Sequence, residues 1–374
     1  MRYTNWHAVI YRLACLWLAI SSSLSVCAQT QGPHWMNPLD AGYPVVDGRG
    51  WQEGMANPYD RLPGYAEQQV RSAVWSLSRN AAGLYISFRT DAARIQVRYG
   101  VKGEKAMPHM PATGVSGLDL YARGADGQWT WARAGYRFGD TIDYTWTGLA
   151  TAGIETEYRL YLPLYNTVTW MQFAADSKGF QFLPFSREKP IVAYGTSIMQ
   201  GGCASRPGLA WTSILGRMRS DNIINLGFSG NGQLEKPLID AMAKIDAKLY
   251  ILDCMPNLVD RLKFPPEEVE RRTRQAVQSL REAHPGVPIL LTEHCCGITG
   301  SNLDAGLVKR YDDCSRVMAD IHAKMVKEGV KGLYLLTAKE IGFDQDCTVD
   351  GTHPNDIGMM RYAEANARKI RKIL

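Results

Sequence analysis

Between residues 190 and 337 the sequence alternates five short apolar runs with longer segments of helical periodicity. The runs are PIVAYG, NIINLG, KLYILDC, PILLTEH and GLYLLT. A run that is apolar at every position is typical of a parallel strand that is buried on both faces, and each intervening segment is long enough to return as a helix. Residues 186–374 are therefore predicted to form an α/β domain, with a parallel sheet and helices on both of its faces.

Residues 29–185 have a different pattern, in which apolar or aromatic residues alternate with polar ones. The stretches are SAVWSLSRN, GLYISFRTDAARIQVRYGV, SGLDLYARGADGQWTWARAGY and TEYRLYLPLY followed by TVTWMQFAAD. A period of two with frequent Asn, Asp and Gly predicts antiparallel strands, and Asp126-Gly127 is a candidate hairpin turn. We expect an all-β sandwich or jelly-roll domain that precedes the α/β domain.

The first 28 residues resemble a secretory leader. Arg2 and Arg12 precede an apolar run that ends in Val26-Cys27-Ala28, a small-residue cleavage pattern. We expect an exported protein, periplasmic or secreted, that is cleaved near Ala28. A lipid anchor on Cys27 is the weaker alternative, because Val26 is bulky for that position. No run is long enough to predict stable insertion into a membrane.

Charge and cysteine spacing exclude several classes of function. The formal charge of +5 falls to +3 when the leader arginines are removed, and no basic cluster is interleaved with aromatics, so nucleic-acid binding is not expected. Cys295 and Cys296 are adjacent rather than spaced as a zinc pair, so no metal is expected. Export permits disulfides, but the sequence leaves pairing open among Cys203, Cys254, Cys295, Cys296, Cys314 and Cys347.

Polar residues follow four of the predicted strands. Ser197 follows the first, Gly230 the second and Asn257 the third, while Asp350 and His353 come after the fifth. Ligands of an open parallel sheet bind beyond the carboxyl ends of its strands, so these residues should meet at one rim. A hydroxyl, an imidazole, a carboxylate and amide donors are the parts of a hydrolytic site.

In these four stretches the sequence resembles the SGNH or GDSL-type serine hydrolases. YGTSI stands at the serine block, NLGFSGNG at the glycine block, DCMPN at the asparagine block and DGTHPN at the Asp-x-x-His block, in the family's order. The resemblance implies a three-layer α/β/α sandwich with about five parallel strands. The serine block reads G-T-S-I where the family has G-D-S-L, and the asparagine block lacks the common G-x-N-D ending. Both variants are similar to those of SGNH relatives that carry an N-terminal β-sandwich domain.

Carried over position by position, the resemblance implies that Ser197 is the nucleophile, His353 the base and Asp350 its orienting partner. The backbone N–H groups of Ser197 and Gly230 and the side-chain amide of Asn257 would form the oxyanion hole. No organic cofactor is implied. The α/β-hydrolase elbow fits less well, because G-T-S-I-M lacks the glycine at its fifth position.

Three further residues are candidates for substrate binding. Glu293 and His294 end the fourth run, where a polar side chain either contacts substrate or is solvated or bonded to backbone. Arg206, in the loop after Ser197, either meets an anionic group or is a solvated surface arginine. The tryptophans before residue 190 are either core residues or a sugar-stacking surface.

The sequence and the resemblance together predict a serine esterase that hydrolyses short acyl esters, acetyl above all, on a carbohydrate, through an acyl-enzyme on Ser197. Three alternatives stay open: an acyltransferase, an esterase for lipids or small molecules, and a glycan-binding protein without catalysis. Cys347, just before the Asp350 turn, is a candidate for a disulfide that would hold that turn. The sequence does not indicate the oligomeric state.

Overall fold

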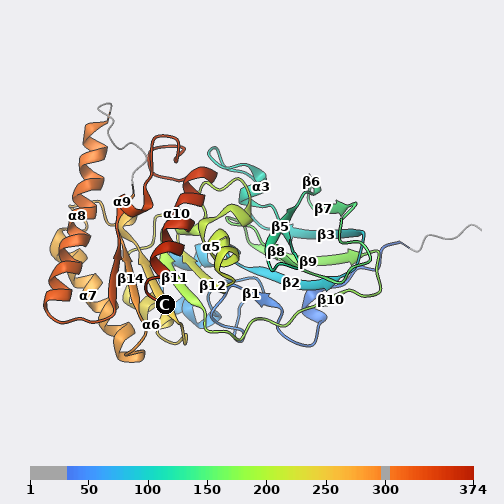
Figure 1. Cartoon of the computed structure of the whole chain (residues 1–374), viewed down its shortest axis with the longest axis horizontal. Coiled ribbons are helices and arrows are strands. Elements are labelled where there is room, and N and C mark those ends of the chain that lie inside the picture. Colours follow the sequence, from blue (N-terminus) through green and yellow to red (C-terminus); the bar gives the residue numbers. More distant parts are fainter. Residues whose placement is uncertain (1–31, 296–303) are drawn as a thin grey trace, which may run out of the picture. The chain divides into compact units, whose positions relative to one another are not determined.

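The computed structural model describes residues 32–295 and 304–374, of which Trp35 to Leu374 form one compact unit (Figure 1). The predicted leader and Cys296 lie outside the described residues. Three sheets are formed within the described ranges: two antiparallel sheets early in the chain and one parallel sheet after residue 190. Among these same residues, no helix is both long and apolar enough to cross a membrane.

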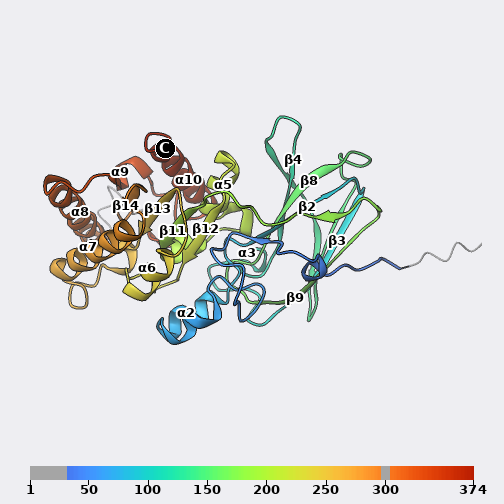
Figure 2. The same cartoon turned by 90° about the horizontal axis from the view of Figure 1, so that it is seen from below.

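The two antiparallel sheets confirm the predicted β-sandwich. One contains β1 (Val46–Asp47), β2 (Tyr85–Thr90), β4 (Asp119–Arg123), β5 (Trp129–Ala132), β8 (Thr156–Tyr161) and β10 (Gln181–Phe182). The other contains β3 (Arg94–Val101), β6 (Gly135–Phe138), β7 (Ile142–Thr147) and β9 (Val168–Ala175). Figure 2 shows β2, β4 and β8 of the first sheet beside β3 and β9 of the second. Alternate side chains of both sheets, such as Phe88 and Val97, bury a shared core. Gly127 turns the β4–β5 hairpin with a φ of +78°, as predicted.

One predicted strand is wrong. The stretch SAVWSLSRN forms the helix α2 (Ser72–Ser78), in which Val74 and Ser78 are buried. Residues four apart share a helix face, so an alternating pattern over nine residues fits a short helix as well as a strand. Tertiary packing decides between them, because Val74 joins the apolar cluster of Ile224 and Leu226 beside the parallel sheet.

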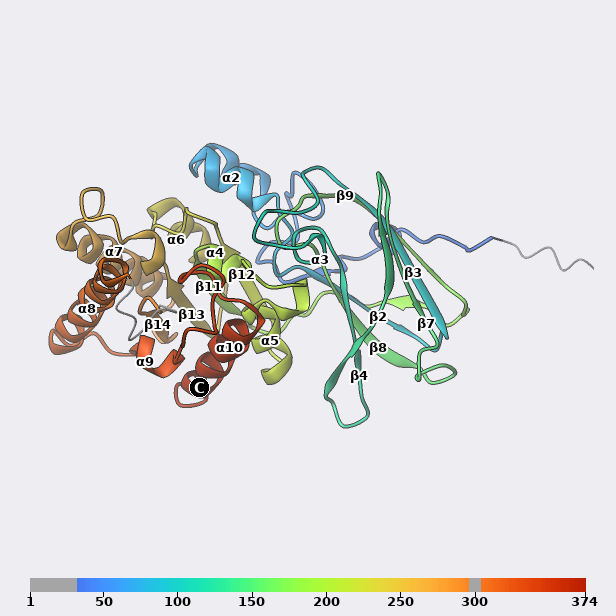
Figure 3. The ribbon, with the colours of Figure 1, turned by 90° about the horizontal axis from the view of Figure 1, so that it is seen from above.

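The parallel sheet confirms the predicted α/β fold. Its strands, in spatial order, are β12 (Ile223–Gly227), β11 (Ile191–Gly195), β13 (Leu249–Asp253), β14 (Ile289–Thr292) and β15 (Leu333–Leu336). Successive side chains of each strand point to opposite faces of the sheet, and each face packs on a layer of helices. The helices α6 (Lys236–Met242), α7 (Pro266–Ala283) and α8 (Ala305–Lys327) cover one face, and α5 (Trp211–Arg219) and α10 (Asp356–Ile370) cover the other (Figure 3).

The register of the sheet brings three strand ends to one level. Gly195 at the end of β11 is aligned with Gly227 of β12 and with Asp253 of β13. In this strand order the chain reverses its direction of winding between β11 and β13, and ligands of such sheets bind outside that point. Ser197 follows the first of these two strands and Asn257 the second, so they flank it.

The edge of the parallel sheet at β12 is covered by a segment from the first half of the chain. The fully buried Arg61 donates from Nη1 to the carbonyl oxygens of Asn225, at 3.2 Å, and Gly227, at 2.6 Å. Its Nε and Nη2 donate to the carbonyls of Asn80 and Leu77. Carbonyl groups at the edge of a sheet need such donors when water is excluded.

Candidate active site

Ser197 lies on the turn between β11 and the short helix α4 (Ser197–Gln200). Thr196 caps this helix, because its hydroxyl accepts a hydrogen bond from the Ile198 N–H. The Ser197 side chain is 6% exposed, and its Oγ lies 2.8 Å from Nε2 of His353. A serine 156 residues earlier in the chain is thus within hydrogen-bonding distance of the imidazole.

The other imidazole nitrogen contacts Asp350. His353 Nδ1 lies 2.7 Å from Asp350 Oδ2, and Asp350 Oδ1 accepts the N–H groups of Thr352 and His353. Burial alone would raise the pKa of Asp350, but these hydrogen bonds outweigh it and hold the pKa below its usual value. Gly351 permits the tight turn with a φ of +83°. The arrangement keeps an ionised carboxylate against the ring.

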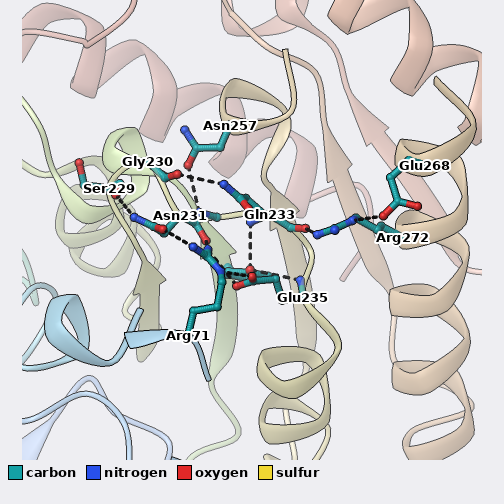
Figure 4. Close-up of polar contacts among 11 residues, drawn as sticks. Arg71, Ser229, Gly230, Asn231, Gln233, Glu235, Asn257, Glu268 and Arg272 are labelled. Carbon is teal, nitrogen blue, oxygen red and sulfur yellow. Dashed lines mark hydrogen bonds and ion pairs between the residues drawn. The ribbon is translucent and has the colours of Figure 1, made fainter. Parts of the chain in front are cut away.

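The three predicted oxyanion donors lie at the turn after β11 and on the loops after β12 and β13. Gly230 follows β12 with a φ of +69°, and Asn257 ends a short 3-10 helix after β13. Asn257 Oδ1 accepts the Gly232 N–H at 3.0 Å, which fixes the amide so that its NH2 group remains free to donate (Figure 4). Within the described ranges, the N–H groups of Ser197 and Gly230 and the Asn257 NH2 have no hydrogen-bond acceptor.

Glycines let the loop after β12 approach the serine turn. A Cβ on Gly232 would lie 2.2 Å from the Gly195 oxygen, and one on Gly227 would lie 2.2 Å from the Gln200 nitrogen. The Phe228 N–H also donates to the Gly195 carbonyl at 3.0 Å. The glycine-rich sequence therefore allows backbone contact between this loop and the end of β11.

A network of polar side chains holds the glycine loop from outside (Figure 4). Arg71, the residue before α2, donates from Nη1 to Asn231 Oδ1 at 2.7 Å and pairs with Glu235. Gln233 donates to the Gly230 carbonyl at 3.2 Å. Because Arg71 belongs to the first half of the chain, the loop that carries Gly230 is supported from a segment about 160 residues away.

Glu293 and His294 follow β14 and have different surroundings. Glu293 accepts the Ala338 N–H at 2.8 Å, so its carboxylate is bonded to the start of α9 (Ala338–Ile341). Burial, together with the nearby His353, lowers the pKa of His294 from 6.5 to about 3, so the ring is neutral. The His294 ring lies 4.0 Å from the Tyr311 ring. Contact of Glu293 and His294 with a substrate stays a prediction.

Of the two interpretations of Arg206, the solvated surface arginine is wrong. Its Nη1 lies 2.6 Å from Asp119 Oδ2 and 2.8 Å from the Tyr121 hydroxyl. Asp119 is 2% exposed and also accepts the Gly208 N–H. Arg206 therefore joins the loop after Ser197 to strand β4 of the sandwich.

The structure adds residues that sequence reasoning missed. A hollow of about 620 Å³ beside Asp350 is lined by residues 106–111 together with Val349. The His109 ring lies 6.3 Å from the His353 ring, and the Tyr165 hydroxyl donates to the Ser197 carbonyl at 3.3 Å. Tyr165 and the segment 106–111, which includes His109, belong to the first half of the chain, between strands, and the alternating pattern carries no signal for them.

The described cysteines form no disulfide. Cys203, Cys254, Cys295, Cys314 and Cys347 are buried, and no disulfide joins any two of them. The predicted disulfide at Cys347 is therefore wrong, because its thiol contacts the Asp344 carboxylate at 3.2 Å instead of a second sulfur. Among the described residues, no cluster of three or more His, Cys, Asp or Glu side chains could hold a metal ion.

Asp253, at the end of β13, gives a prediction for stability. Burial raises its pKa from 3.8 to about 7, against one hydrogen bond from the Tyr362 hydroxyl at 2.7 Å. Between these pH values the folded protein binds a proton that the unfolded chain does not, so this group's contribution to stability falls as the pH rises from about 4 to about 7. We expect Asp253→Asn to flatten that fall.

Urea unfolding at pH 5 and pH 7.5 measures the effect as the difference between the two unfolding free energies. Asp246→Asn is the matched control, since this carboxylate is 62% exposed. An Asp253→Asn protein whose stability changes with pH as steeply as that of the wild type would contradict the assignment.

Comparison with known proteins agrees with the fold. A model of the GDSL-like lipase/acylhydrolase family matches residues 188–371, and a GxDLY model, the N-terminus of SGNH-type esterases, matches residues 33–179. The G-x-D-L-Y pattern occurs at residues 117–121. It includes Asp119 and Tyr121, which contact Arg206. No curated protein matches the sequence.

Solved structures extend this result. A GDSL-like lipase from Bacteroides ovatus is 32% identical with a TM-score of 0.80, over 91% of this chain and 97% of that one. A salicylyl-acyltransferase from a tetracycline biosynthetic pathway is 20% identical with a TM-score of 0.71, over 92% and 98%. A family two carbohydrate esterase from Clostridium thermocellum is 14% identical with a TM-score of 0.51, over 77% and 91%. The last two share the fold. The matches over both halves show that this chain belongs to the GDSL-like lipase/acylhydrolase family, in the form that carries an N-terminal GxDLY domain.

Proposed function

We propose that the protein is an exported serine esterase that removes short acyl groups, acetyl above all, from carbohydrate. The observation that supports this most directly is the unbroken series of contacts from Ser197 Oγ through the His353 ring to the Asp350 carboxylate. A nucleophile, a base and a group that orients the base are the requirements for acyl transfer through a covalent intermediate.

In the proposed reaction His353 Nε2 takes the Ser197 proton as Oγ attacks the acyl carbon. The N–H groups of Ser197 and Gly230 and the Asn257 NH2 stabilise the negative oxygen of the tetrahedral intermediate. The imidazolium returns the proton to the leaving sugar oxygen, and the acyl group stays on Ser197. His353 then activates a water that releases the acid, and Asp350 stabilises the imidazolium in both steps.

The carbohydrate part of the proposal is supported by the fold shared with carbohydrate esterases. It is tested by measuring the release of acid from p-nitrophenyl esters of two to twelve carbons, from acetylated xylan and from a triglyceride. We expect kcat/KM to be highest for acetate and acetate to be released from xylan. A preference for long chains and triglyceride would replace the proposal with a lipid esterase, and transfer to an added alcohol faster than to water would replace it with an acyltransferase.

Substitution of Asn257 tests the oxyanion hole. We expect Asn257→Ala to lower kcat by about 10²- to 10³-fold with little change in KM, because the donor acts chiefly on charge that develops in the transition state. Asn257→Asp is the matched variant, since it keeps the oxygen that accepts the Gly232 N–H and lacks the NH2 group. If Asn257→Asp hydrolyses p-nitrophenyl acetate at the wild-type rate, the Asn257 side chain is not a donor to the oxyanion.

A further inference from the structure

A second hollow, of about 530 Å³, lies on the sandwich domain and does not include the residues of the proposed active site. We call it the β-domain cavity. It is lined by side chains of β4 to β7 and of the loop after Ser197, among them Asp119, Trp131, Arg133, Tyr136, Tyr144 and Arg206. Its volume lies within the range of small-molecule sites, about 300 to 1,000 Å³.

Two aromatic rings of the cavity are held in place and open to solvent. Trp131 is 44% exposed, although its Nε1 donates to Asp119 Oδ1 at 2.6 Å. Tyr136 is 56% exposed and stacks on Tyr144, with ring centroids 5.4 Å apart. Exposed aromatic side chains that are fixed by neighbours offer a binding surface that costs little conformational entropy to occupy.

The polar groups of the cavity are mainly donors. Both Asp119 oxygens are already engaged, by Trp131 and by Arg206 with the Gly208 N–H. In the described part of the chain, the Arg206 side chain makes its hydrogen bonds through Nη1 alone, and its guanidinium carbon lies 4.3 Å from the centre of the Trp131 ring. Arg133 is exposed. Within the described residues its guanidinium and the remaining Arg206 N–H groups have no acceptor, so they are available to hydroxyl or carboxylate oxygens of a ligand.

Some residues that line the β-domain cavity are close in sequence to residues of the proposed active site. Pro111 lines the hollow beside Asp350, and Thr113, two residues later on α3 (Ala112–Val115), lines the β-domain cavity. Ser205 also lines this cavity, and it donates to Asp356, three residues after His353. The hollow beside Asp350 and the β-domain cavity therefore have lining residues only two positions apart in the sequence.

We propose that the β-domain cavity binds a pyranose ring of the polysaccharide that carries the ester. Tyr136 and Trp131 contact the apolar C–H face of the sugar, and Arg133 and Arg206 donate to its hydroxyl groups or, in a uronic acid, to its carboxylate. The inference rests on the proposed function for the polysaccharide as substrate class. The binding itself requires no catalysis and is tested separately.

The test is calorimetric titration of full-length Ser197→Ala protein with unacetylated xylohexaose and with hexagalacturonate. We expect binding of at least one of them, and a loss of affinity of about tenfold on adding Tyr136→Ala. Arg133→Ala should weaken both ligands if hydroxyl groups are its partners, and only hexagalacturonate if the carboxylate is. Trp170→Ala, a 39% exposed aromatic that does not line the cavity, is the matched control and should have no effect.

In otherwise active protein, Tyr136→Ala should raise KM for acetylated polysaccharide and leave both kcat and KM for p-nitrophenyl acetate unchanged, because that ester is too small to reach the cavity. Absence of binding to both oligosaccharides, or binding that Tyr136→Ala and Arg133→Ala leave intact, would overturn the inference even where esterase activity is found. Binding that depends on Tyr136 in a protein without esterase activity would support the cavity and refute the proposed function.

Discussion

Replacing Ser197 with alanine is expected to lower kcat for p-nitrophenyl acetate by about 10⁴- to 10⁶-fold, the range found when a catalytic nucleophile is removed from an assembled Ser-His-Asp site. The reason is that without Oγ the His353 ring has no hydroxyl to deprotonate, and no covalent acyl intermediate forms. Any remaining rate comes from water activated by the imidazole and from the oxyanion donors.

The measurement combines kinetics with intact-protein mass spectrometry after rapid quenching. Wild-type protein should gain the mass of one acyl group and Ser197→Ala protein none. Ser72→Ala is the control, because this exposed serine lies at the start of α2 and has no contact with the imidazole. A Ser197→Ala rate close to that of the wild type would refute the proposed nucleophile.

Replacing Arg61 with leucine is expected to destabilise the protein by about 3–5 kcal/mol, comparable to breaking a buried ionic contact. Arg61 is fully buried and donates to four carbonyl oxygens, so leucine removes one donor from each of them, although the Leu77 carbonyl still accepts the Asn80 N–H. An unsatisfied buried polar group costs about 1–3 kcal/mol, and local relaxation recovers part of the total. Burial lowers the pKa of Arg61 to about 9, so at neutral pH the side chain is charged.

Urea unfolding followed by circular dichroism provides the free energies. Arg61→Lys keeps the charge but lacks the planar fork that reaches several carbonyls, so we expect an intermediate loss of stability. The Arg61→Lys protein also allows the unfolding free energy to be measured if the Arg61→Leu protein does not fold. Arg187→Leu is the control, since that arginine is exposed. Equal unfolding midpoints for wild-type and Arg61→Leu protein would show that the contacts of Arg61 contribute no net stability.

The parallel sheet could be predicted because its strands are buried on both faces and must be apolar throughout. That requirement leaves a local signal in PIVAYG or KLYILDC that hardly depends on the rest of the chain. The position of Ser197 at a strand end followed from the same pattern. The structure places His353 within hydrogen-bonding distance of both Ser197 and Asp350, as the sequence led us to expect. Their catalytic roles stay predictions.

Other features could not be predicted because they depend on contacts between distant residues. The alternation in residues 72–80 fits two structures, and packing of Val74 beside β12 selects the helix. The contacts of Arg61 with β12 and of Arg71 with the glycine loop join residues about 160 positions apart, and nothing in the neighbouring sequence marks either arginine. The same holds for Arg206, whose partner Asp119 lies 87 positions earlier.

The contact of Arg61 with the outer edge of β12 has a consequence for engineering. A fragment that starts near residue 186 would lack the cover over the outer side of β12, and its bare backbone groups would be free to pair with a second copy of the fragment. Recombining this hydrolase half with a foreign sandwich domain would meet the same difficulty, unless the donor domain supplied a guanidinium at the equivalent place. The two halves are therefore best exchanged among relatives as a single piece.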